Sequence, residues 1–240
     1  MKVFYYCNFP SPYYIGYLNE LGKLCELTAV FERGYSSERD SSWKQFEADS
    51  ISNLVVLHGI HTSADMAFCP QITRIVKEEL FDAYIIHDTA SPTGIWLIWY
   101  LKRHGIPFVL QSEGGFPGDG KTGLKEKLKY KLMSGAILYL SPIRRERAYF
   151  LSYGASNETL KWYPFASFYE KDVLAAPKTE REKETIRLKL GVKEKKVIVS
   201  VGRIIPSKGY DVLIESIKDL GKDVGVYIIS GPPDKDLEEL

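Results

Sequence analysis

The feature that most constrains the fold is an alternation of short apolar runs with longer amphipathic segments. Strands that are apolar on both faces are typical of a parallel sheet covered by helices on both sides. The predicted strands are Val3–Cys7, Leu27–Phe31, Leu54–Leu57, Ala83–His87, Phe108–Gln111, Ala136–Leu140 and Leu160–Tyr163. The predicted helices are Ile15–Leu24, Gln71–Leu80, Thr93–Arg103, Leu124–Met133 and Ile143–Tyr153. We therefore predict an α/β domain over residues 1–165.

Two local signals refine this pattern. Ser141 before Pro142 is typical of an N-cap with proline at the first helical position, and Gly154 suits the end of the same helix. The polar segment Gly34–Asn53 shows no clear period. We predict that it is a long surface excursion between two strands.

The pattern changes near residue 165. Pro164–Lys178 has no periodicity and suits an interdomain connection, and Thr179-x-x-Glu182 predicts a capping box that opens a short charged helix. An α/β rhythm then restarts with a strand, a helix and a strand: Lys196–Val201, Tyr210–Leu220 and Val224–Ser230. Since domains of this kind usually need ~100 residues, we expect a linker with a short helix at 166–190 and an incomplete second domain at 191–240.

Composition and charge exclude several classes of function. A formal net charge of +1 lacks the basic excess that a nucleic-acid partner requires. Cys7, Cys25 and Cys69 form no C-x-x-C pair, which argues against a disulfide framework or zinc site and for a reducing cytosol. The longest apolar run, Ile95–Leu101, is far shorter than the ~20 residues that span a bilayer. We predict a cytoplasmic protein, or one that rests on a membrane surface.

The most specific motif follows the predicted strand Lys196–Val201. The strand leads into Gly202-Arg203, a short loop carries Lys208-Gly209, and an amphipathic helix comes next. Ligands of open α/β sheets bind at the carboxyl ends of strands, where glycines permit close approach and a helix N-terminus attracts anions. These four residues therefore suit a diphosphate. The alternative is that the two cations are ordinary loop residues.

This motif resembles the donor site of family 4 retaining glycosyltransferases, which have the GT-B fold of two facing Rossmann-type domains. The resemblance extends more weakly over the whole chain, including the exit Tyr163-Pro164-Phe165. It implies that Arg203 and Lys208 hold the diphosphate of a nucleotide sugar, linked to UDP or GDP, without metal or cofactor. The family's second-domain pair of glutamates is not reached by residue 240. The resemblance therefore implies that the 240-residue chain by itself is inactive.

The resemblance also implies a reaction. A hexose-type sugar would pass from the nucleotide diphosphate to a hydroxyl of a glycan or a lipid-linked acceptor, with retention of configuration. Bacterial cell-surface polysaccharide biosynthesis is the setting that this implies. Two alternatives stay open: an inverting GT-B transferase, for which His87, Asp88 or Glu113 would serve as the base, and a non-catalytic binding module.

A second group of candidate residues follows the predicted strand Phe108–Gln111. Glu113, Gly114 and Gly115 come at a strand's carboxyl end, where a surface can meet a ligand. Glu113 aligns nearest to the family's sugar-contacting histidine, so that histidine does not carry over. A carboxylate there can orient a sugar hydroxyl or stabilise positive charge at the anomeric carbon. The structural alternative is that Glu113 caps a turn.

The remaining candidates lie at or after the ends of three other predicted strands. His87-Asp88 can position a hydroxyl or transfer a proton, although neighbouring residues of a strand face opposite ways. The resemblance implies that Gly16 is the glycine that the family places between acceptor and donor phosphates, and the alternative is a glycine that is small only for steric reasons. His58-x-x-His61 has loose metal-ligand spacing but no partner ligand nearby, so we predict no metal site.

A basic region suggests a further contact. Lys121–Lys131 and the arginines at 144, 145 and 147 place positive charge on neighbouring segments. Their cationic side is either a solvated face or a surface that rests on anionic lipid at the inner face of the plasma membrane.

Overall fold

The computed structural model describes residues 1–36, 39, 41–44, 46–63, 65–87, 89–113, 115, 123–144 and 147–230. The chain divides into two compact units, Met1–Val173 and Leu174–Leu240.

The first unit is built on a seven-stranded parallel sheet, and all seven predicted strands are confirmed. Its strands are β1 (Lys2–Cys7), β2 (Glu26–Phe31), β3 (Asn53–Val56), β6 (Ala83–Ile86), β7 (Val109–Gln111), β8 (Leu138–Ser141) and β9 (Leu160–Trp162). Their order across the sheet is β3-β2-β1-β6-β7-β8-β9. Val3 of β1 pairs with Leu27 on one side and Ala83 on the other. The order therefore reverses between β1 and β6, as in a Rossmann-type sheet.

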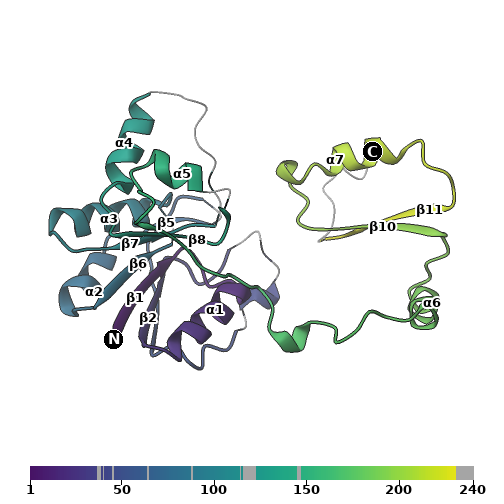
Figure 1. Cartoon of the computed structure of the whole chain (residues 1–240), viewed down its shortest axis with the longest axis horizontal. Coiled ribbons are helices and arrows are strands. Elements are labelled where there is room, and N and C mark those ends of the chain that lie inside the picture. Colours follow the sequence, from purple (N-terminus) through teal and green to yellow (C-terminus); the bar gives the residue numbers. More distant parts are fainter. Residues whose placement is uncertain are drawn as a thin grey trace. The chain divides into compact units, whose positions relative to one another are not determined.

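Helices cover both faces of the sheet. Their bounds are α1 (Pro12–Gly22), α2 (Ile72–Glu78), α3 (Pro92–Arg103), α4 (Leu124–Met133) and α5 (Arg147–Ser152). Alternate residues of β1 belong to two hydrophobic cores, one on each face of the sheet. Phe4 and Tyr6 pack with α2, α3, α4 and α5, whereas Val3 and Tyr5 pack with α1. Figure 1 shows α1 on one side of the sheet and α4 and α5 on the other. This two-sided cover explains why the central strands β1 and β2 are buried on both faces.

Serine caps begin the two helices next to the reversal point. Ser11 accepts a hydrogen bond from the Tyr14 amide, and Ser91 accepts one from the Gly94 amide at 3.0 Å. Proline follows each serine at the first helical position, which fits its fixed φ. The N-cap predicted at Ser141 is wrong. Ser141 ends β8, and its hydroxyl accepts from the Ile143 amide at 3.2 Å in a local turn.

The connection between β2 and β6 is more structured than the sequence predicts. It contains a short 3₁₀ helix, η1 (Ser41–Lys44), and a hairpin of β4 (Ile60–His61) and β5 (Ala67–Phe68). Glu32 is buried there: its Oε2 accepts from the Tyr6 hydroxyl at 2.5 Å and its Oε1 from the Ala67 amide at 2.9 Å. Buried carboxylates need such donors, so this pair of bonds fixes the hairpin to the sheet.

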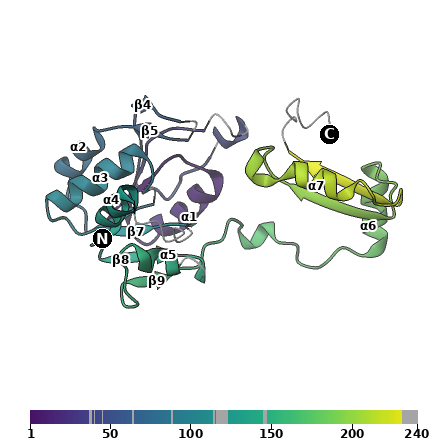
Figure 2. The ribbon, with the colours of Figure 1, turned by 90° about the horizontal axis from the view of Figure 1, so that it is seen from above.

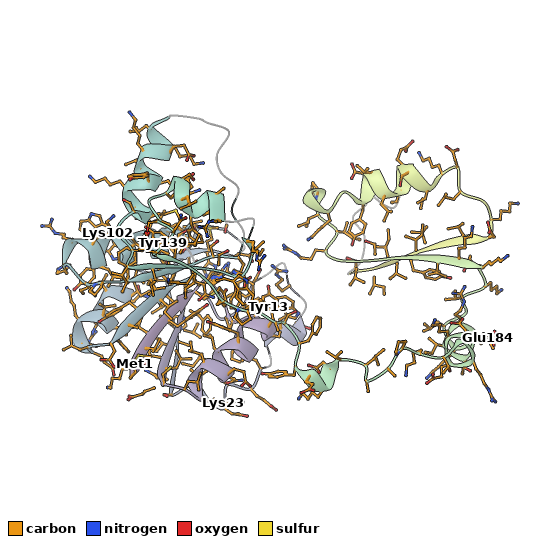
Figure 3. The ribbon with its side chains drawn as sticks, in the orientation of Figure 1. Met1, Tyr13, Lys23, Lys102, Tyr139 and Glu184 are labelled. Carbon is orange, nitrogen blue, oxygen red and sulfur yellow. The ribbon has the colours of Figure 1, made fainter. Side chains whose placement is uncertain are left out.

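Two polar side chains fix α4 in place. The Tyr139 hydroxyl of β8 donates to the Met133 carbonyl at 2.9 Å, and Lys102 Nζ of α3 donates to the Ser134 carbonyl at 2.6 Å. Both side chains are labelled in Figure 3. They satisfy backbone acceptors at and just beyond the end of α4, which the helix itself cannot pair.

The second unit contains a charged helix and one strand–helix–strand motif. Its elements are α6 (Glu180–Lys189), β10 (Lys196–Val201), the 3₁₀ helix η4 (Pro206–Lys208), α7 (Tyr210–Ile217) and β11 (Val224–Ile229). The capping box of Thr179 and Glu182 is confirmed at the start of α6. β10 and β11 pair in parallel, and α7 runs alongside them in Figures 1 and 2. Among this unit's described residues, Tyr210 is the single buried large hydrophobic side chain.

Candidate functional site

The reversal point of the first unit's sheet places two chain segments side by side. β1 ends at Cys7 and leads to α1 on one face, whereas β6 ends at Ile86 and leads to α3 on the other. Such switch points open a crevice at the carboxyl edge of a sheet, where ligands of open α/β folds bind. His87 follows β6 and lies at this edge.

Tyr14 connects α1 to His87. Its hydroxyl lies in short hydrogen-bond contact with His87 Nε2, and the two rings meet edge to face with centroids 4.5 Å apart. Ser11 caps the helix at the Tyr14 amide, which sets the position of this side chain. A direct contact therefore spans the two elements that diverge at the switch point.

Glu113 joins the same group. Glu113 lies close enough to act electrostatically on the Tyr14 hydroxyl, and it acts on Tyr5 and Tyr17 as well. Burial is the main reason that the pKa of Tyr17 is raised to about 12. Burial likewise raises the pKa of Tyr14 well above its ordinary value. The tyrosines are therefore neutral donors and acceptors around one carboxyl group.

Further polar side chains complete this assembly, which we call the tyrosine cluster. Gln111 Nε2 donates to the Tyr163 hydroxyl at 2.7 Å, and the Tyr163 ring lies 5.9 Å from that of Tyr17. Two buried atoms, Tyr5 Oη and Gln111 Oε1, have no hydrogen-bond partner among the described residues. Such atoms are rare in folded proteins and often mark functional sites. The cluster consists of Tyr5, Tyr14, Tyr17, His87, Gln111, Glu113 and Tyr163.

The Tyr14 hydroxyl lies between an imidazole, that of His87, and a carboxyl group, that of Glu113. The Tyr14 hydroxyl has one proton, so it donates to one neighbour and accepts from the other. In its bond with His87 Nε2, the imidazole tautomer decides which of the two groups donates. Burial lowers the pKa of His87 to about 4, so its imidazole is neutral at physiological pH. The site thus combines a carboxyl group with a neutral imidazole that is hydrogen-bonded to Tyr14.

This shift predicts a pH-dependent stability. The folded chain binds the His87 proton more weakly than the unfolded chain, whose histidine pKa is about 6.5. The neutral His87 imidazole therefore makes its full contribution to the free energy of unfolding above pH ~6.5. As the pH falls towards 4 this contribution is lost, and the free energy of unfolding decreases by up to about 3 kcal/mol. Urea unfolding at pH 7.5 and pH 5 should show a larger loss for the natural chain than for His87→Gln. The exposed His61→Gln serves as the control, and equal losses in the natural chain and His87→Gln would contradict the assignment.

Two candidate glycines have packing reasons for their small size. Gly16 lies inside α1, where an added Cβ would meet the Tyr169 hydroxyl at 3.2 Å. At Gly115 an added Cβ would come within 2.6 Å of the Tyr149 ring. Their proposed contacts with sugar or acceptor remain predictions. Asp88 and Gly114 lie outside the described residues.

The predicted diphosphate motif occupies the carboxyl end of β10 in the second unit. Gly202 donates its amide to the Ile229 carbonyl at 3.1 Å, and an added Cβ would stand 3.0 Å from the Tyr210 hydroxyl. Gly209 has φ of 64°, a left-handed conformation that favours glycine, directly before α7. Arg203 and the exposed Lys208 therefore lie on one tight loop between a strand end and a helix start.

Two findings concern metals and membranes. Among the described residues no group of three or more His, Cys, Asp or Glu side chains is placed to hold a metal ion. No helix in the described part of the chain has the length and apolarity to cross a bilayer.

Sequence reasoning found His87 and Glu113 but missed the residues that connect them. The Ser11-Pro12 cap was available as a signal for the start of α1 and for the position of Tyr14. The role of Tyr14 itself depends on tertiary contacts that no local pattern encodes.

No protein-family model matches the chain, and no curated protein matches it by sequence. Similar solved structures include HepE of Anabaena in complex with UDP, with a TM-score of 0.69 and 13% identity over 100% of this chain and 64% of that chain. The S. aureus MnaA–UDP co-structure has a TM-score of 0.59 and 14% identity, covering 99% of this chain and 64% of that one.

A third similar structure is the UDP-N-acetylglucosamine 2-epimerase from Rickettsia bellii, with a TM-score of 0.55 and 14% identity over 100% of this chain and 65% of that chain. The chain thus spans just under two thirds of the length of these proteins. At such low identity the likeness establishes the fold, which is α/β and GT-B-like.

Proposed function

We propose that this chain is part of a glycosyltransferase that moves a sugar from a UDP- or GDP-linked donor to a hydroxyl of a glycan or lipid-linked acceptor. The observation that carries the proposal is the Arg203–Lys208 loop at the carboxyl end of β10, which a left-handed Gly209 joins to α7. The similar structures crystallised with UDP or UDP-glucose support a nucleotide-sugar ligand.

The second unit supplies the leaving-group contacts in this proposal. As the glycosidic bond breaks, the diphosphate leaves with the bonding electrons and gains negative charge. Arg203 and Lys208 stabilise that charge, together with the amide groups at the start of α7. The acceptor oxygen forms the new bond to the anomeric carbon and gives its proton to an oxygen of the departing diphosphate.

The first unit supplies the sugar contacts. Glu113 either orients a sugar hydroxyl or stabilises positive charge at the anomeric carbon, with the Tyr14 hydroxyl within its electrostatic reach. Retention of configuration, membership of family 4 and a role in cell-surface polysaccharide biosynthesis belong to the proposal. An inverting reaction would instead need a base, for which the neutral His87 and Glu113 are available. The anomeric configuration of the product, measured by NMR, decides between them.

The nucleotide contacts give the direct test. Arg203→Ala and Lys208→Ala should each weaken UDP or GDP binding about tenfold to a hundredfold, since a charge-assisted hydrogen bond contributes roughly 1.5–3 kcal/mol. Calorimetry should be done in a form of the protein that binds nucleotide, with Lys222→Ala, an exposed cation of the same unit, as the control. EDTA should leave binding unchanged. Unaltered affinity in both variants would refute the assignment and favour a different binding module.

The comparison with an epimerase gives a second candidate reaction. Epimerisation of a UDP-sugar needs no acceptor, whereas transfer does. Incubation of the protein with UDP-N-acetylglucosamine alone should therefore leave the sugar's configuration unchanged. Appearance of the 2-epimer without an acceptor would replace transfer by epimerisation.

Peripheral membrane contact is the remaining part of the proposal. Leu124 and Leu128 of α4 are 74% and 59% exposed, and lysines at 125, 127 and 131 lie on the same helix. Exposed leucines beside lysines suit a helix that rests on anionic lipid.

A further inference from the structure

A pocket of about 250 Å³ lies at the carboxyl ends of β8 and β9, outside the tyrosine cluster. Three cations and one large aromatic side chain are among the residues that line it. It is lined by Ser141, Ile143, Arg144, Arg147, Leu160, Lys161 and Trp162. Strands β6 to β9 are parallel neighbours, so this pocket opens at the same edge of the sheet as His87 and Glu113.

The cations of the pocket are available to an anion. Within the described residues no carboxylate lies within 4 Å of Arg144, Arg147 or Lys161. Arg147 Nη2 donates to the neutral Asn157 Oδ1 at 2.5 Å. Glu158 interacts electrostatically with Lys161, and its Oε2 accepts a hydrogen bond from the Ser156 hydroxyl at 2.6 Å. Uncompensated positive charge in a concave site attracts phosphate or carboxylate groups.

Trp162 adds a flat apolar platform. Trp162 is 64% exposed, yet its indole Nε1–H donates a hydrogen bond to the Pro142 carbonyl at 3.0 Å. The indole is therefore held in one orientation with much of its surface in solvent. The negative π face of an indole attracts weakly positive C–H groups, such as those on one face of a pyranose ring. A cationic pocket with such a platform suits a sugar that has an anionic substituent.

The position of the pocket relates it to the proposed reaction. Neighbouring strands lie about 4.8 Å apart, so the pocket is roughly 7 Å from the line of β7 and roughly 12 Å from that of β6. A saccharide seated on Trp162 would extend along the strand ends towards Glu113.

We propose that this pocket binds the phosphate-bearing sugar of the acceptor, with the phosphate on Arg144, Arg147 and Lys161 and a pyranose ring on Trp162. The inference that this ligand is the acceptor rests on the proposed function. The binding chemistry of the pocket does not, because all of its residues belong to the first unit.

Binding can be measured on the 240-residue chain with glucose 1-phosphate, glucose and inorganic phosphate as probes. We expect tryptophan fluorescence to change with glucose 1-phosphate, and this change to disappear in Trp162→Phe. Arg144→Ala should weaken binding about threefold to tenfold, as exposed charge-assisted contacts do, and added salt should weaken it further. Arg144→Lys should recover part of the affinity. Lys127→Ala, an exposed cation of α4 outside the pocket, is the matched control.

Three results would overturn the pocket assignment. They are equal affinity for glucose and glucose 1-phosphate, equal affinity for inorganic phosphate and glucose 1-phosphate, and binding that Arg144→Ala leaves unchanged. Arginine-dependent binding to phosphatidylglycerol vesicles without any binding of glucose 1-phosphate would also overturn it, in favour of a lipid headgroup. The two tests are independent. If nucleotide affinity is unaltered in Arg203→Ala and Lys208→Ala while glucose 1-phosphate still binds the pocket, the proposed function and the acceptor role are refuted. The assignment of the pocket as a binding site for a phosphorylated sugar then stands.

Discussion

Replacing Glu113 by glutamine should lower sugar-transfer turnover about a hundredfold or more, while nucleotide affinity stays nearly unchanged. Glutamine keeps the size of the side chain and an oxygen that can accept from Tyr14, but it removes the negative charge. A positioned carboxylate that acts on charge or protons in the transition state contributes roughly 10² to 10⁴ in rate. The measurement is kcat in a form of the protein that transfers sugar, together with calorimetry of the nucleotide.

Glu78→Gln is the matched control, because Glu78 is an exposed glutamate whose described ion pair is with Arg74 on the same helix. It should leave turnover unchanged. A lower melting temperature of Glu113→Gln with full turnover per folded molecule would contradict the catalytic role. Glu113 would then be a residue that stabilises the turn after β7.

The second large effect concerns the relative stability of the two units in the 240-residue chain. Phe4, Tyr5 and Tyr6 of β1 are fully buried, whereas Val199 and Val201 of β10 are 56% and 73% exposed. Little apolar burial leaves little free energy to oppose local unfolding. Amides of β1 should therefore exchange with deuterium at least roughly a thousandfold more slowly than those of β10, a difference of about 4 kcal/mol in opening free energy.

The exchange should be measured by mass spectrometry on a preparation shown to be monomeric by size-exclusion chromatography. Low urea is an internal control: it should accelerate exchange in β10 first and leave β1 protected until the first unit unfolds. Equal protection of β1 and β10 in the monomer would show that the strand–helix–strand motif is stable with few buried side chains.

The sheet was predictable because its strands carry an unambiguous signal. The central strands are runs that are apolar on both faces, and both faces of β1 and β2 are in fact buried, whereas the edge strand β9 contains Lys161 and is largely exposed. The hairpin of β4 and β5 was missed because each of its strands has two residues, too few for any period. Three Ser-Pro pairs occur at positions 11, 91 and 141, and the prediction chose the one that makes a turn. The pairs look alike in sequence, and tertiary context decides which of them begins a helix.

The candidate site was predictable only at the ends of strands. His87 and Glu113 follow β6 and β7, so the rule for parallel sheets locates them. Tyr14 and Tyr163 come from an α-helix and from the segment after the last strand. With 16 tyrosines in the chain, composition does not indicate which of them contact His87 or Gln111. The pocket at Arg144 and Trp162 was likewise not predictable, because its walls come from residues at the ends of two different strands, β8 and β9.

The lengths of the edge strands have a consequence for self-association. The seven-stranded sheet ends in β3 and β9, which have four and three residues, and β9 has Lys161 at its centre. Short, charged edges resist pairing with another chain. The two-stranded sheet differs, because β10 and β11 each have six residues, mostly β-branched, and their outer edges are unpaired among the described residues. Any ordered aggregation of this chain should therefore start from the second sheet and leave the first one folded.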